Sequence, residues 1–519
     1  MLEPEVYPHS AEKIQHIETH ISHIFLAGAY AYKVKKPLNL GFLDFSSLTK
    51  RKFYCREEIR LNRRLTQDMY LKVVAIIEKN RQLRISNLPE RPQENTIEYA
   101  VCMRRFKRET ELDNLLLRNK LSEKLIVEIA DKVAAFHLAA TVAPPTAEYG
   151  TADKILEPVL ANFSQISNCI DNPGVNARVD TLKKWSKKSW QRLKGTFVTR
   201  HKNGFIRECH GDMHLANMVY WQGQVHIFDG IEFNPHLRWI DVISEAAFLV
   251  MDLDSRQRSD LAISFLNRYL AATGDYVALE LINYYLGYRA VVRAKVAAIR
   301  LSQADISKDA KASQFDSLNA HLELAAQYSL ERQPFMLIMH GLSGSGKSTL
   351  AKALAGKLRA VVLRSDLERK RLFGLLSGSN SSLSGDMYSQ AAGKAVYQYL
   401  LELALKISKS GWPVIIDATF LKVKQRKKFK QSAEGHNLPA LILNLQAKKS
   451  ALFSRVTARK AKGRDISDAD TQVLQKQLDT HETIRLEEAA YTLNIDVNTW
   501  PDVDNLGARI SSKLNKRTY

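Results

Sequence analysis

The chain has 519 residues, a length that favours two or three domains of roughly 100–200 residues each over a single core. Hydrophobic residues make up 45% and charged residues 25%, and the lack of any run of about 18 apolar residues argues against a membrane-spanning helix. A net charge of +21 favours anionic partners such as nucleotides, phosphorylated metabolites or nucleic acid, without choosing among them.

The four cysteines lie far apart in the sequence and form no CxxC pair. This usage is typical of a reducing compartment and argues against both a disulfide framework and a Cys-based zinc site. The first ten residues, MLEPEVYPHS, lack the basic and apolar regions of a secretory signal. We therefore expect a cytoplasmic protein with no membrane partner, and its oligomeric state stays open.

The first hundred residues are rich in β-formers. Residues 23–34 alternate in polarity around an Ala-Gly-Ala turn, which predicts a hairpin whose second strand carries Lys33. A helix is expected over 46–65, with Ser46 or Ser47 as its N-cap. Two further strands are expected over 71–78 and 96–105.

After residue 110 the apolar residues recur with helical spacing. The clearest predicted helices cover 111–117, 124–140 and 281–301. The sequence therefore predicts a small β-rich lobe over 1–107 and a helical lobe over 108–330, which includes a polar connecting segment.

The remaining residues, 331–519, are expected to form a separate domain in which strands and helices alternate. The expected strands cover 335–340, 360–365, 413–417, 439–445 and 493–497. Such alternation predicts a parallel sheet covered on both faces.

Residues 341–348 read GLSGSGKS and stand between an expected strand and an expected helix. Glycines let backbone N–H groups turn toward phosphate oxygens without a Cβ in the way. We expect Lys347 to reach the β- and γ-phosphates and to take part in catalysis, and the Ser348 hydroxyl to ligate magnesium. The full set expected to hold the nucleotide is Gly341, Ser343, Gly344, Ser345, Gly346, Lys347, Ser348 and Thr349.

Two carboxylates follow strands of this domain, at the edge of the sheet where ligands of open α/β folds collect. Asp366 is placed to accept the proton of an attacking hydroxyl, and Asp417 to hold magnesium through water or to orient Ser348. Helix capping is the alternative for both carboxylates.

An arginine-rich segment follows further along the chain, with Arg455, Arg459 and Arg464. Arg455 and Arg459 are four residues apart, so a helix would place them on one face. We expect that face to close over the triphosphate and neutralise its charge. A solvated basic surface is the alternative.

The motifs GLSGSGKST, LRSD and VIIDATF, with the arginine-rich segment before SDAD, resemble those of the small P-loop kinases that phosphorylate metabolites and polynucleotide 5′ ends. The resemblance covers the part of the chain after residue 330 and implies that Asp366 acts as a base. It does not identify the substrate.

Residues 210–217 read HGDMHLAN and carry the spacing of a kinase catalytic loop. Asp212 would accept the proton of a substrate hydroxyl, and Asn217 would ligate magnesium. Asp229 follows a short predicted strand and can chelate the metal that bridges the phosphates. Two short strands joined by WQGQ would carry both sites to one edge.

This second set of motifs resembles the aminoglycoside phosphotransferase and choline kinase group, whose fold is that of the protein kinases. The resemblance implies a strand lysine that contacts the α- and β-phosphates and pairs with a helix glutamate. We assign Lys33 as the lysine, with Lys35 as the alternative, and Glu58 as the glutamate, with Glu57 as the alternative. As a whole, the chain resembles bacterial two-part proteins in which an aminoglycoside-phosphotransferase-like domain precedes an ATP-binding kinase domain.

Two further expectations concern the helical lobe. Asp241 is predicted to brace the catalytic loop from the next helix. Arg289 and Arg293, four residues apart, are expected either to line a pocket for a phosphorylated or acidic acceptor or to belong to an ordinary salt-bridged helix surface.

The predicted fold class is thus a two-domain α/β and α+β protein, with a bilobal protein-kinase-like first part and a parallel-sheet P-loop second part. We expect a bifunctional phosphotransferase that moves the γ-phosphoryl of MgATP to hydroxyl groups of small molecules, anionic ones included, with ATP and Mg²⁺ as cofactors. Two alternatives stay open. One half is a nucleotide-sensing regulatory module, or the protein is a polynucleotide 5′-hydroxyl kinase or RNA-repair factor, although direct nucleic-acid binding is not favoured.

Overall fold

The structure is a computed structural model that describes residues 1–519 except 40, 42, 88–94, 304–305, 376–385, 388, 463–469 and 516–519. The described chain forms two compact units. Unit 1 comprises residues 1–252 and 288–319, and unit 2 comprises residues 253–287 and 320–519. The segment 253–287 therefore belongs to the unit of the P-loop sheet, although it precedes residue 330 in the sequence.

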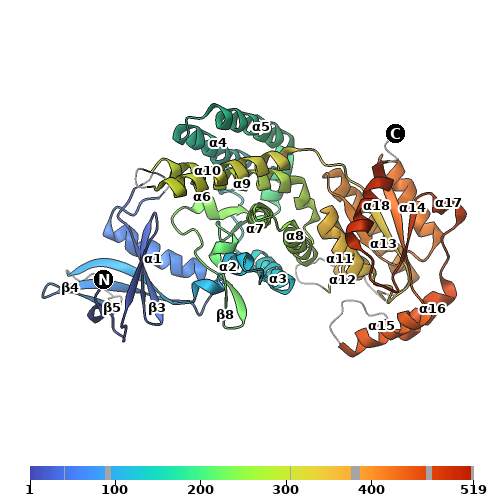
Figure 1. Ribbon diagram of the computed structural model, residues 1–519, viewed down its shortest axis with the longest axis horizontal. Helices are drawn as coiled ribbons and strands as arrows, with labels where there is room; N and C mark the ends of the chain where they lie inside the picture. Colours follow the sequence, from blue (N-terminus) through green and yellow to red (C-terminus); the bar gives the residue numbers. More distant parts are fainter. Residues whose placement is uncertain are drawn as a thin grey trace. The chain divides into compact units, whose positions relative to one another are not determined.

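Unit 1 begins with a six-stranded antiparallel sheet, drawn in blue in Figure 1. In the order β1-β2-β3-β6-β4-β5, its strands are β1 (Ile14–Glu18), β2 (Ser22–Ala27), β3 (Tyr30–Lys35), β6 (Thr96–Arg104), β4 (Tyr70–Lys79) and β5 (Gln82–Asn87). A short 3-10 helix, η1 (Pro4–Val6), precedes the sheet, and α1 (Leu48–Asn62) packs against β6 and β4.

The structure confirms the predicted β2–β3 hairpin, the β4 and β6 strands and the helix α1. Gly28 makes the hairpin turn with φ +56°, and a Cβ there would meet the Ser10 carbonyl oxygen at 2.9 Å, which explains the glycine. The Ser47 hydroxyl accepts a hydrogen bond from Lys50 N, so Ser47 is the N-cap. The edge strands β1 and β5, largely exposed, were not predicted.

The rest of unit 1 is mainly helical, as the spacing of apolar residues predicted. Its helices are η2 (Arg108–Thr110), α2 (Leu112–Leu117), α3 (Glu123–Ala139), α4 (Ala152–Cys169), α5 (Pro173–Lys202), η3 (Leu215–Asn217) and α6 (Pro235–Arg238). Two small antiparallel pairs join β7 (Ile206–Glu208) to β10 (Trp239–Asp241), and β8 (Met218–Trp221) to β9 (Gln224–Ile227). The helices α7 (Val242–Ser255), α9 (Leu279–Leu301) and α10 (Lys308–Ser329) begin in one unit and end in the other.

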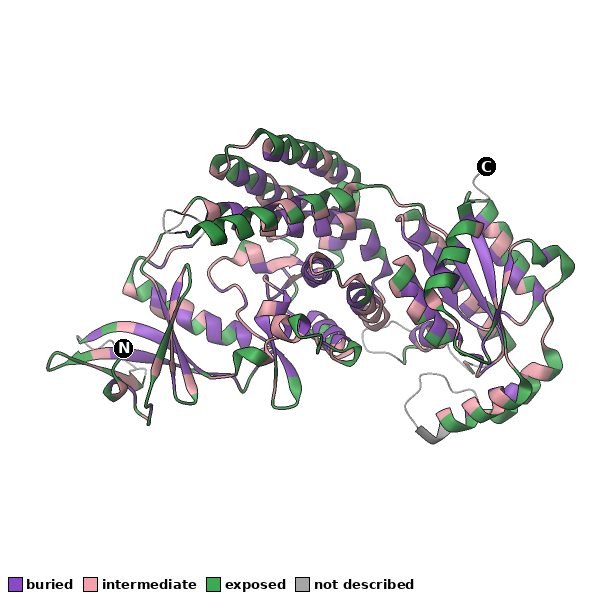
Figure 2. Cartoon of the chain, in the orientation of Figure 1, coloured by how far each residue is buried: buried purple, intermediate pink, exposed green. Residues whose placement is uncertain are grey.

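Unit 2 contains a five-stranded, entirely parallel sheet, as predicted. In the order β12-β13-β11-β14-β15, its strands are β12 (Val361–Arg364), β13 (Val414–Asp417), β11 (Met336–His340), β14 (Ala440–Gln446) and β15 (Thr492–Asp496). Every residue of β11 and β13 is buried, and Figure 2 shows these central strands in the buried colour. Continuous apolar runs of this kind belong to strands covered on both faces.

Helices of unit 2 surround its sheet, although not all of them contact it. The helices of this unit are α8 (Ser259–Thr273), η4 (Tyr276–Ala278), α11 (Lys347–Leu358), α12 (Ser365–Leu372), α13 (Gln390–Lys409), α14 (Val423–Glu434), α15 (Lys449–Lys462), α16 (Thr471–Thr480), α17 (Leu486–Ala489) and α18 (Val503–Asn515). α11 contacts three strands of the sheet as well as α8 and α18. The predicted fold class is confirmed. None of the helices in the described ranges has the length and apolarity needed to cross a membrane.

Candidate nucleotide sites

The loop 341–346 connects the central strand β11 to the N-terminus of α11, and its three glycines all have positive φ. Gly344 has φ +82°, and a Cβ there would meet the Leu452 carbonyl oxygen at 2.8 Å. Gly341 is also left-handed, and a Cβ there would meet Ser345 Oγ at 2.8 Å. We call residues 341–348 the phosphate loop, because it aims the N-terminus of a helix at the edge of the sheet, where anions bind.

Lys347 is buried beneath this loop. Its Nζ donates hydrogen bonds to the carbonyl oxygens of Gly341 and Leu342, at 2.9 and 2.8 Å. Burial lowers the pKa of Lys347 to about 8, although the carboxylates Asp417 and Asp366 act in the opposite direction. The lysine therefore loses its proton at a lower pH than an exposed lysine, and a nearby phosphate would favour its charged form.

A pocket of about 610 Å³ opens beside the phosphate loop, and we call it the phosphate pocket. It brings together most of the predicted side chains of unit 2. The predicted residues that line it are Ser343, Gly344, Gly346, Lys347, Ser348, Thr349, Asp366, Asp417, Arg455 and Arg459. Gly341 and Ser345 line a different cavity, and Arg464 lies outside the described residues.

The two carboxylates of the phosphate pocket have different surroundings. Asp417 is buried at the end of β13, and burial raises its pKa, against a hydrogen bond from Ser348. Asp366 lies within the first turn of α12, whereas the N-cap is Arg364, so Asp366 does not occupy the capping position. This placement leaves the Asp366 carboxylate at the pocket wall.

Sequence reasoning missed several residues of the phosphate pocket, notably Arg364, Arg369 and Tyr397. Arg364 Nε lies 3.4 Å from an Asp417 carboxylate oxygen. The signal was present, because both arginines flank Asp366 in the segment LRSDLERKR. Tyr397 comes from α13, far along the chain, and no local pattern points to it.

Arg455 connects the arginine-rich helix α15 to the phosphate loop. Its guanidinium donates to the carbonyl oxygens of Val497, at 2.7 Å, and Gly344, at 3.5 Å. Ser343 N donates to Gln477 Oε1 of α16 at 2.8 Å, so the segments that follow β14 also contact the loop. Arg455 and Arg459 therefore both lie at the pocket, as expected for cations that face a triphosphate.

In unit 1 the hairpin β8–β9 lies between the two predicted motifs. The segment 209–217, which we call the catalytic loop, leads into β8, and Asp229 follows β9. Asn217 Nδ2 donates to the Asp212 carbonyl oxygen at 2.9 Å and to its carboxylate at 3.0 Å. The backbone N–H of Phe228 donates to the Asn217 carbonyl oxygen at 2.9 Å, which brings the two motifs side by side.

His214 is a further member of the catalytic loop that sequence reasoning did not single out. Its Nε2 lies 3.3 Å from an Asp212 carboxylate oxygen. Although burial acts against the charged forms, the Asp212 carboxylate raises the pKa of His214, and the imidazole lowers the pKa of Asp212. The pair thus keeps Asp212 ionised, which is the state of a proton acceptor.

The helix partner of the strand lysines is Glu58. Lys33 Nζ lies 2.9 Å from one Glu58 oxygen and Lys35 Nζ lies 2.6 Å from the other. Against the effect of burial, these two cations lower the pKa of Glu58 to about 2. Glu57 instead pairs with Arg60 at 2.9 Å.

The two lysines differ in their second partner. Lys33 also pairs with Asp229, whereas Lys35 pairs with Glu232 and is fully buried. The structure therefore links the predicted lysine Lys33 to the predicted metal ligand Asp229.

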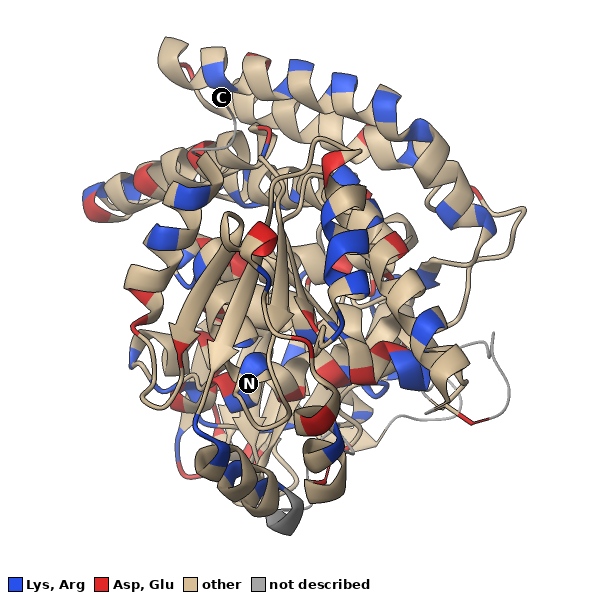
Figure 3. Ribbon diagram, turned by 90° about the vertical axis from the view of Figure 1, so that its right-hand side faces the viewer, with Lys and Arg blue, Asp and Glu red and all other residues tan. Residues whose placement is uncertain are grey.

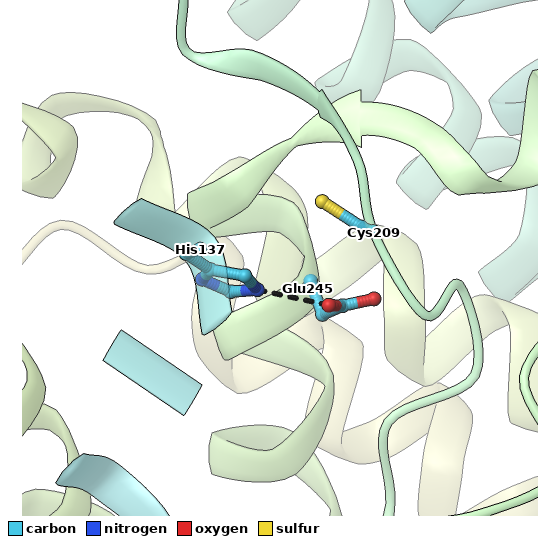
Figure 4. Close-up of side chains that lie close together, drawn as sticks. All are labelled: His137, Cys209 and Glu245. Carbon is cyan, nitrogen blue, oxygen red and sulfur yellow. Dashed lines mark hydrogen bonds and ion pairs between the residues drawn. The ribbon is translucent and has the colours of Figure 1, made fainter. Parts of the chain in front are cut away.

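The catalytic loop is braced by Glu245 on α7. The Glu245 carboxylate accepts hydrogen bonds from the backbone N–H groups of His210, at 3.1 Å, and Gly211, at 2.5 Å. It also accepts one from His137 Nε2 at 2.8 Å, which Figure 4 shows. Asp252, two turns further along α7, accepts from Leu215 N at 2.9 Å.

The prediction that Asp241 braces this loop is wrong. Asp241 forms a buried ion pair with Arg200 of α5 at 2.7 Å. Arg289 is buried and donates to the carbonyl oxygens of Ser244 and Gly211, so it supports the loop rather than lining an acceptor pocket.

Three side chains that could ligate a metal meet behind the catalytic loop. Figure 4 shows His137, Cys209 and Glu245, whose ligand atoms lie within 4.8 Å of one another. Glu245 already accepts three hydrogen bonds, and burial raises the pKa of the Cys209 thiol well above its usual range. A thiolate is the metal-binding form, so this group is a packed brace.

Comparisons with known proteins show what parts of the chain are similar to. A family model described as an AAA domain matches residues 336–484, which include the phosphate loop. Two solved kinases are similar to parts of the chain. A Plasmodium vivax ethanolamine kinase is 10% identical and covers 61% of this chain and 82% of its own, with a TM-score of 0.36. A gluconokinase from Sinorhizobium meliloti is 24% identical, and the match covers 36% of this chain and 94% of the gluconokinase, with a TM-score of 0.25.

A curated relative matches most of the chain. The uncharacterised protein Rv2004c of Mycobacterium tuberculosis strain H37Rv is 30% identical over 447 residues, which are 85% of each chain. A protein of Mycobacterium bovis matches to the same extent. Residues 336–484 are similar to AAA domains, and the chain belongs to the family of these mycobacterial proteins.

Proposed function

We propose that the chain is a bifunctional phosphotransferase that moves the γ-phosphoryl of MgATP to hydroxyl groups of two acceptors, one at each unit. A single kind of observation supports the proposal. In unit 2, Lys347, Asp366 and Asp417 line one pocket, and in unit 1 Lys33 pairs with Asp229 while Asn217 donates to Asp212. Phosphoryl transfer needs little else, because its rate comes from positioning and from neutralising charge on the phosphate oxygens.

In unit 2 the proposed reaction takes place in the phosphate pocket. Asp366 accepts the proton of the acceptor hydroxyl, whose oxygen forms a bond to the γ-phosphorus as the bond to the β-phosphate oxygen breaks. Lys347, Arg455 and Arg459 surround the phosphates with positive charge. The hydroxyl of Ser348 and the carboxylate of Asp417 are the donors that Mg²⁺ prefers, and they would hold it there.

In unit 1 the corresponding roles fall to residues of the catalytic loop and of β3. Asp212, kept ionised by His214, accepts the hydroxyl proton. The oxygens of Asn217 and Asp229 would hold Mg²⁺, which when bound neutralises the charge on the β- and γ-phosphates. Lys33, placed between Glu58 and Asp229, contacts the nucleotide phosphates.

The acceptor of unit 2 is proposed to be anionic. Arg364 and Arg369 line the phosphate pocket on either side of Asp366 in sequence, in addition to the three cations that face the triphosphate. An alcohol that carries a phosphate or carboxylate group would pair with such arginines and bring its hydroxyl to the base.

A polynucleotide 5′ end is the second candidate acceptor, because the net charge is +21. Figure 3 shows Lys and Arg on many helices, interspersed with Asp and Glu. Binding of RNA or DNA oligonucleotides that weakens steeply with salt would support this candidate, since released counterions set that slope. Binding that does not respond to salt would count against it.

The test is a screen of metabolite extracts with γ-labelled ATP and the full chain. Asp212→Asn should remove the labelled products of unit 1, and Asp366→Asn those of unit 2. Asp180→Asn and Asp479→Asn, at exposed positions of α5 and α16, are the matched controls and should change neither. Turnover without any labelled acceptor in the unmodified chain would favour a nucleotide-sensing role instead.

A further inference from the structure

A second cavity, of about 630 Å³, adjoins the phosphate loop in unit 2 and has no part in the reaction proposed above. Gly341, Leu342 and Ser345 form one of its walls, whereas the residues of the loop that face the triphosphate line the phosphate pocket. The end of β14, His481 and residues 483–486 also line the cavity. The loop thus separates two cavities, both within the range of small-molecule sites, about 300–1,000 Å³.

The wall formed by the loop includes a serine whose hydroxyl is closed off from the cavity. Ser345 is only 1% exposed, and its hydroxyl has no hydrogen-bond partner among the described residues. This wall therefore offers no exposed hydroxyl, and a ligand in the cavity is recognised by the other walls.

The floor of the cavity carries two carboxamides. Asn444 Nδ2 donates to Asn494 Oδ1 at 2.8 Å. This bond leaves the Asn444 carbonyl oxygen and the Asn494 amino group as an adjacent acceptor and donor. Such a pair is complementary to the edge of a heterocyclic base, which offers a donor and an acceptor side by side.

The charge and polarity of the remaining walls further restrict the chemical class of the ligand. Among the residues that the structure describes, no aspartate or glutamate lines the cavity, whereas Arg485 and His481 both do. Leucines such as Leu342 and Leu452 provide apolar surface. A ligand that satisfies these walls has a planar hydrogen-bonding ring and one anionic group.

We propose that this cavity is a second small-molecule site, separate from the phosphate pocket, which binds a nucleoside monophosphate. Its base would contact the two carboxamides, and its phosphate would contact Arg485. Because the phosphate loop is a wall of both cavities, the ligand alters the affinity of unit 2 for MgATP, and MgATP alters the affinity for the ligand by the same factor. Binding of the monophosphate does not depend on the proposed phosphotransfer.

The test measures binding of radiolabelled adenosine, guanosine, cytidine and uridine 5′-monophosphates to the full chain, saturated with a non-hydrolysable MgATP analogue. Ala489→Trp places an indole in the cavity, and Ala490→Trp, one residue on and outside the lining, is the matched control. We expect at least one monophosphate to bind, with affinity reduced tenfold or more by Ala489→Trp and unchanged by Ala490→Trp. Asn494→Leu, at an exposed position, should have the same effect as Ala489→Trp without filling the cavity.

Three results would overturn the proposal. They are a lack of binding by all four monophosphates, equal binding by the unmodified, Ala489→Trp and Asn494→Leu chains, and a MgATP affinity that does not respond to a bound monophosphate. Phosphotransfer is measured on the same protein preparations with MgATP in place of the analogue, so a failure of the proposed reaction is seen separately from a failure of this site.

Discussion

At the scale of single residues, the pair Lys33 and Lys35 shows how one carboxylate serves two roles. The two lysines are two positions apart on β3 and therefore point to the same face. Both contact Glu58, but Lys33 also contacts Asp229, whose side chain is 45% exposed, and Lys35 contacts Glu232, which is 4% exposed. We infer that Lys33 serves the site and Lys35 serves the fold.

Substitution of each lysine by methionine should separate these roles. Lys35→Met leaves Glu232 buried without a cation and should lower the free energy of unfolding by about 3–5 kcal/mol. Lys33→Met leaves Glu58 paired with Lys35, so it should lower stability less and reduce phosphotransfer by unit 1 by about 100-fold. Denaturant unfolding and turnover of the two variants test this, and equal losses of stability would contradict the assignment.

The buried Lys347 predicts a pH dependence for unit 2. Its pKa is lowered to about 8, so it is charged below that pH and becomes neutral above it. Phosphate oxygens attract only the charged form. Nucleotide affinity should therefore be constant below pH 8. As the pH rises from 8 to 9.5 the affinity should fall, and its decrease should approach tenfold for each pH unit. The stability of the ligand-free chain has the opposite pH dependence. Because a lysine in the unfolded chain keeps its proton up to about pH 10.4, the free energy of unfolding rises as the pH increases from 8 toward that value.

Isothermal titration with a non-hydrolysable MgATP analogue, in a Lys33→Met background that weakens the first site, measures this dependence. In the same background Lys347→Met should bind weakly with no pH slope between 7 and 9.5. A slope that persists in this variant would assign the titration to another group.

At the scale of elements, helix α8 completes the sheet of unit 2. The edge strand β12 would otherwise expose unpaired backbone groups, which invite pairing with other chains. Asn267 of α8 accepts a hydrogen bond from Val362 N at 2.7 Å and donates one to the Ala360 carbonyl oxygen at 3.0 Å. Nearby, the hydroxyl of Tyr276 donates to Glu368 at 2.8 Å. These contacts explain why 253–287 belongs to this unit.

Asn267→Leu keeps the approximate size of the side chain and removes both hydrogen bonds. It should lower the free energy of unfolding of unit 2 by about 1–3 kcal/mol, because two backbone groups lose their partners. Asn168→Leu, at an exposed position on α4, is the control and should change stability by less than about 0.5 kcal/mol. Thermal and denaturant unfolding measure both, and equal effects would show that α8 does not protect the edge.

At the scale of the whole molecule, the two proposed sites share no residue, although α7, α9 and α10 run through the boundary between the units. If the sites are independent, Lys347→Ala should abolish nucleotide binding by unit 2 and leave phosphotransfer by unit 1 unchanged. Asp212→Asn should have the converse effect on transfer. Binding and turnover are measured separately for each site, and loss of both activities from one substitution would show that the sites are coupled.

The sequence by itself predicted those parts of the fold and of the two sites that depend on residues close together in the chain. The glycines of the phosphate loop, the spacing of Asp212 and Asn217, and the apolar strands of the parallel sheet are local patterns. Steric limits on the backbone and the burial of central strands allow few alternatives to such patterns. They were sufficient to predict two nucleotide sites on two different folds.

The tertiary structure alone decided which distant side chains meet. Glu57 and Glu58 are equivalent by position in sequence, and only the packing of α1 on the sheet turns Glu58 toward the lysines. For the same reason the catalytic loop is held by Glu245 rather than by Asp241. The cavity behind Ser345 is likewise formed by segments more than a hundred residues apart. The spacing of residues along a chain predicts helices, strands and loops. Contacts between elements far apart in the sequence depend on how those elements pack, which the spacing does not predict.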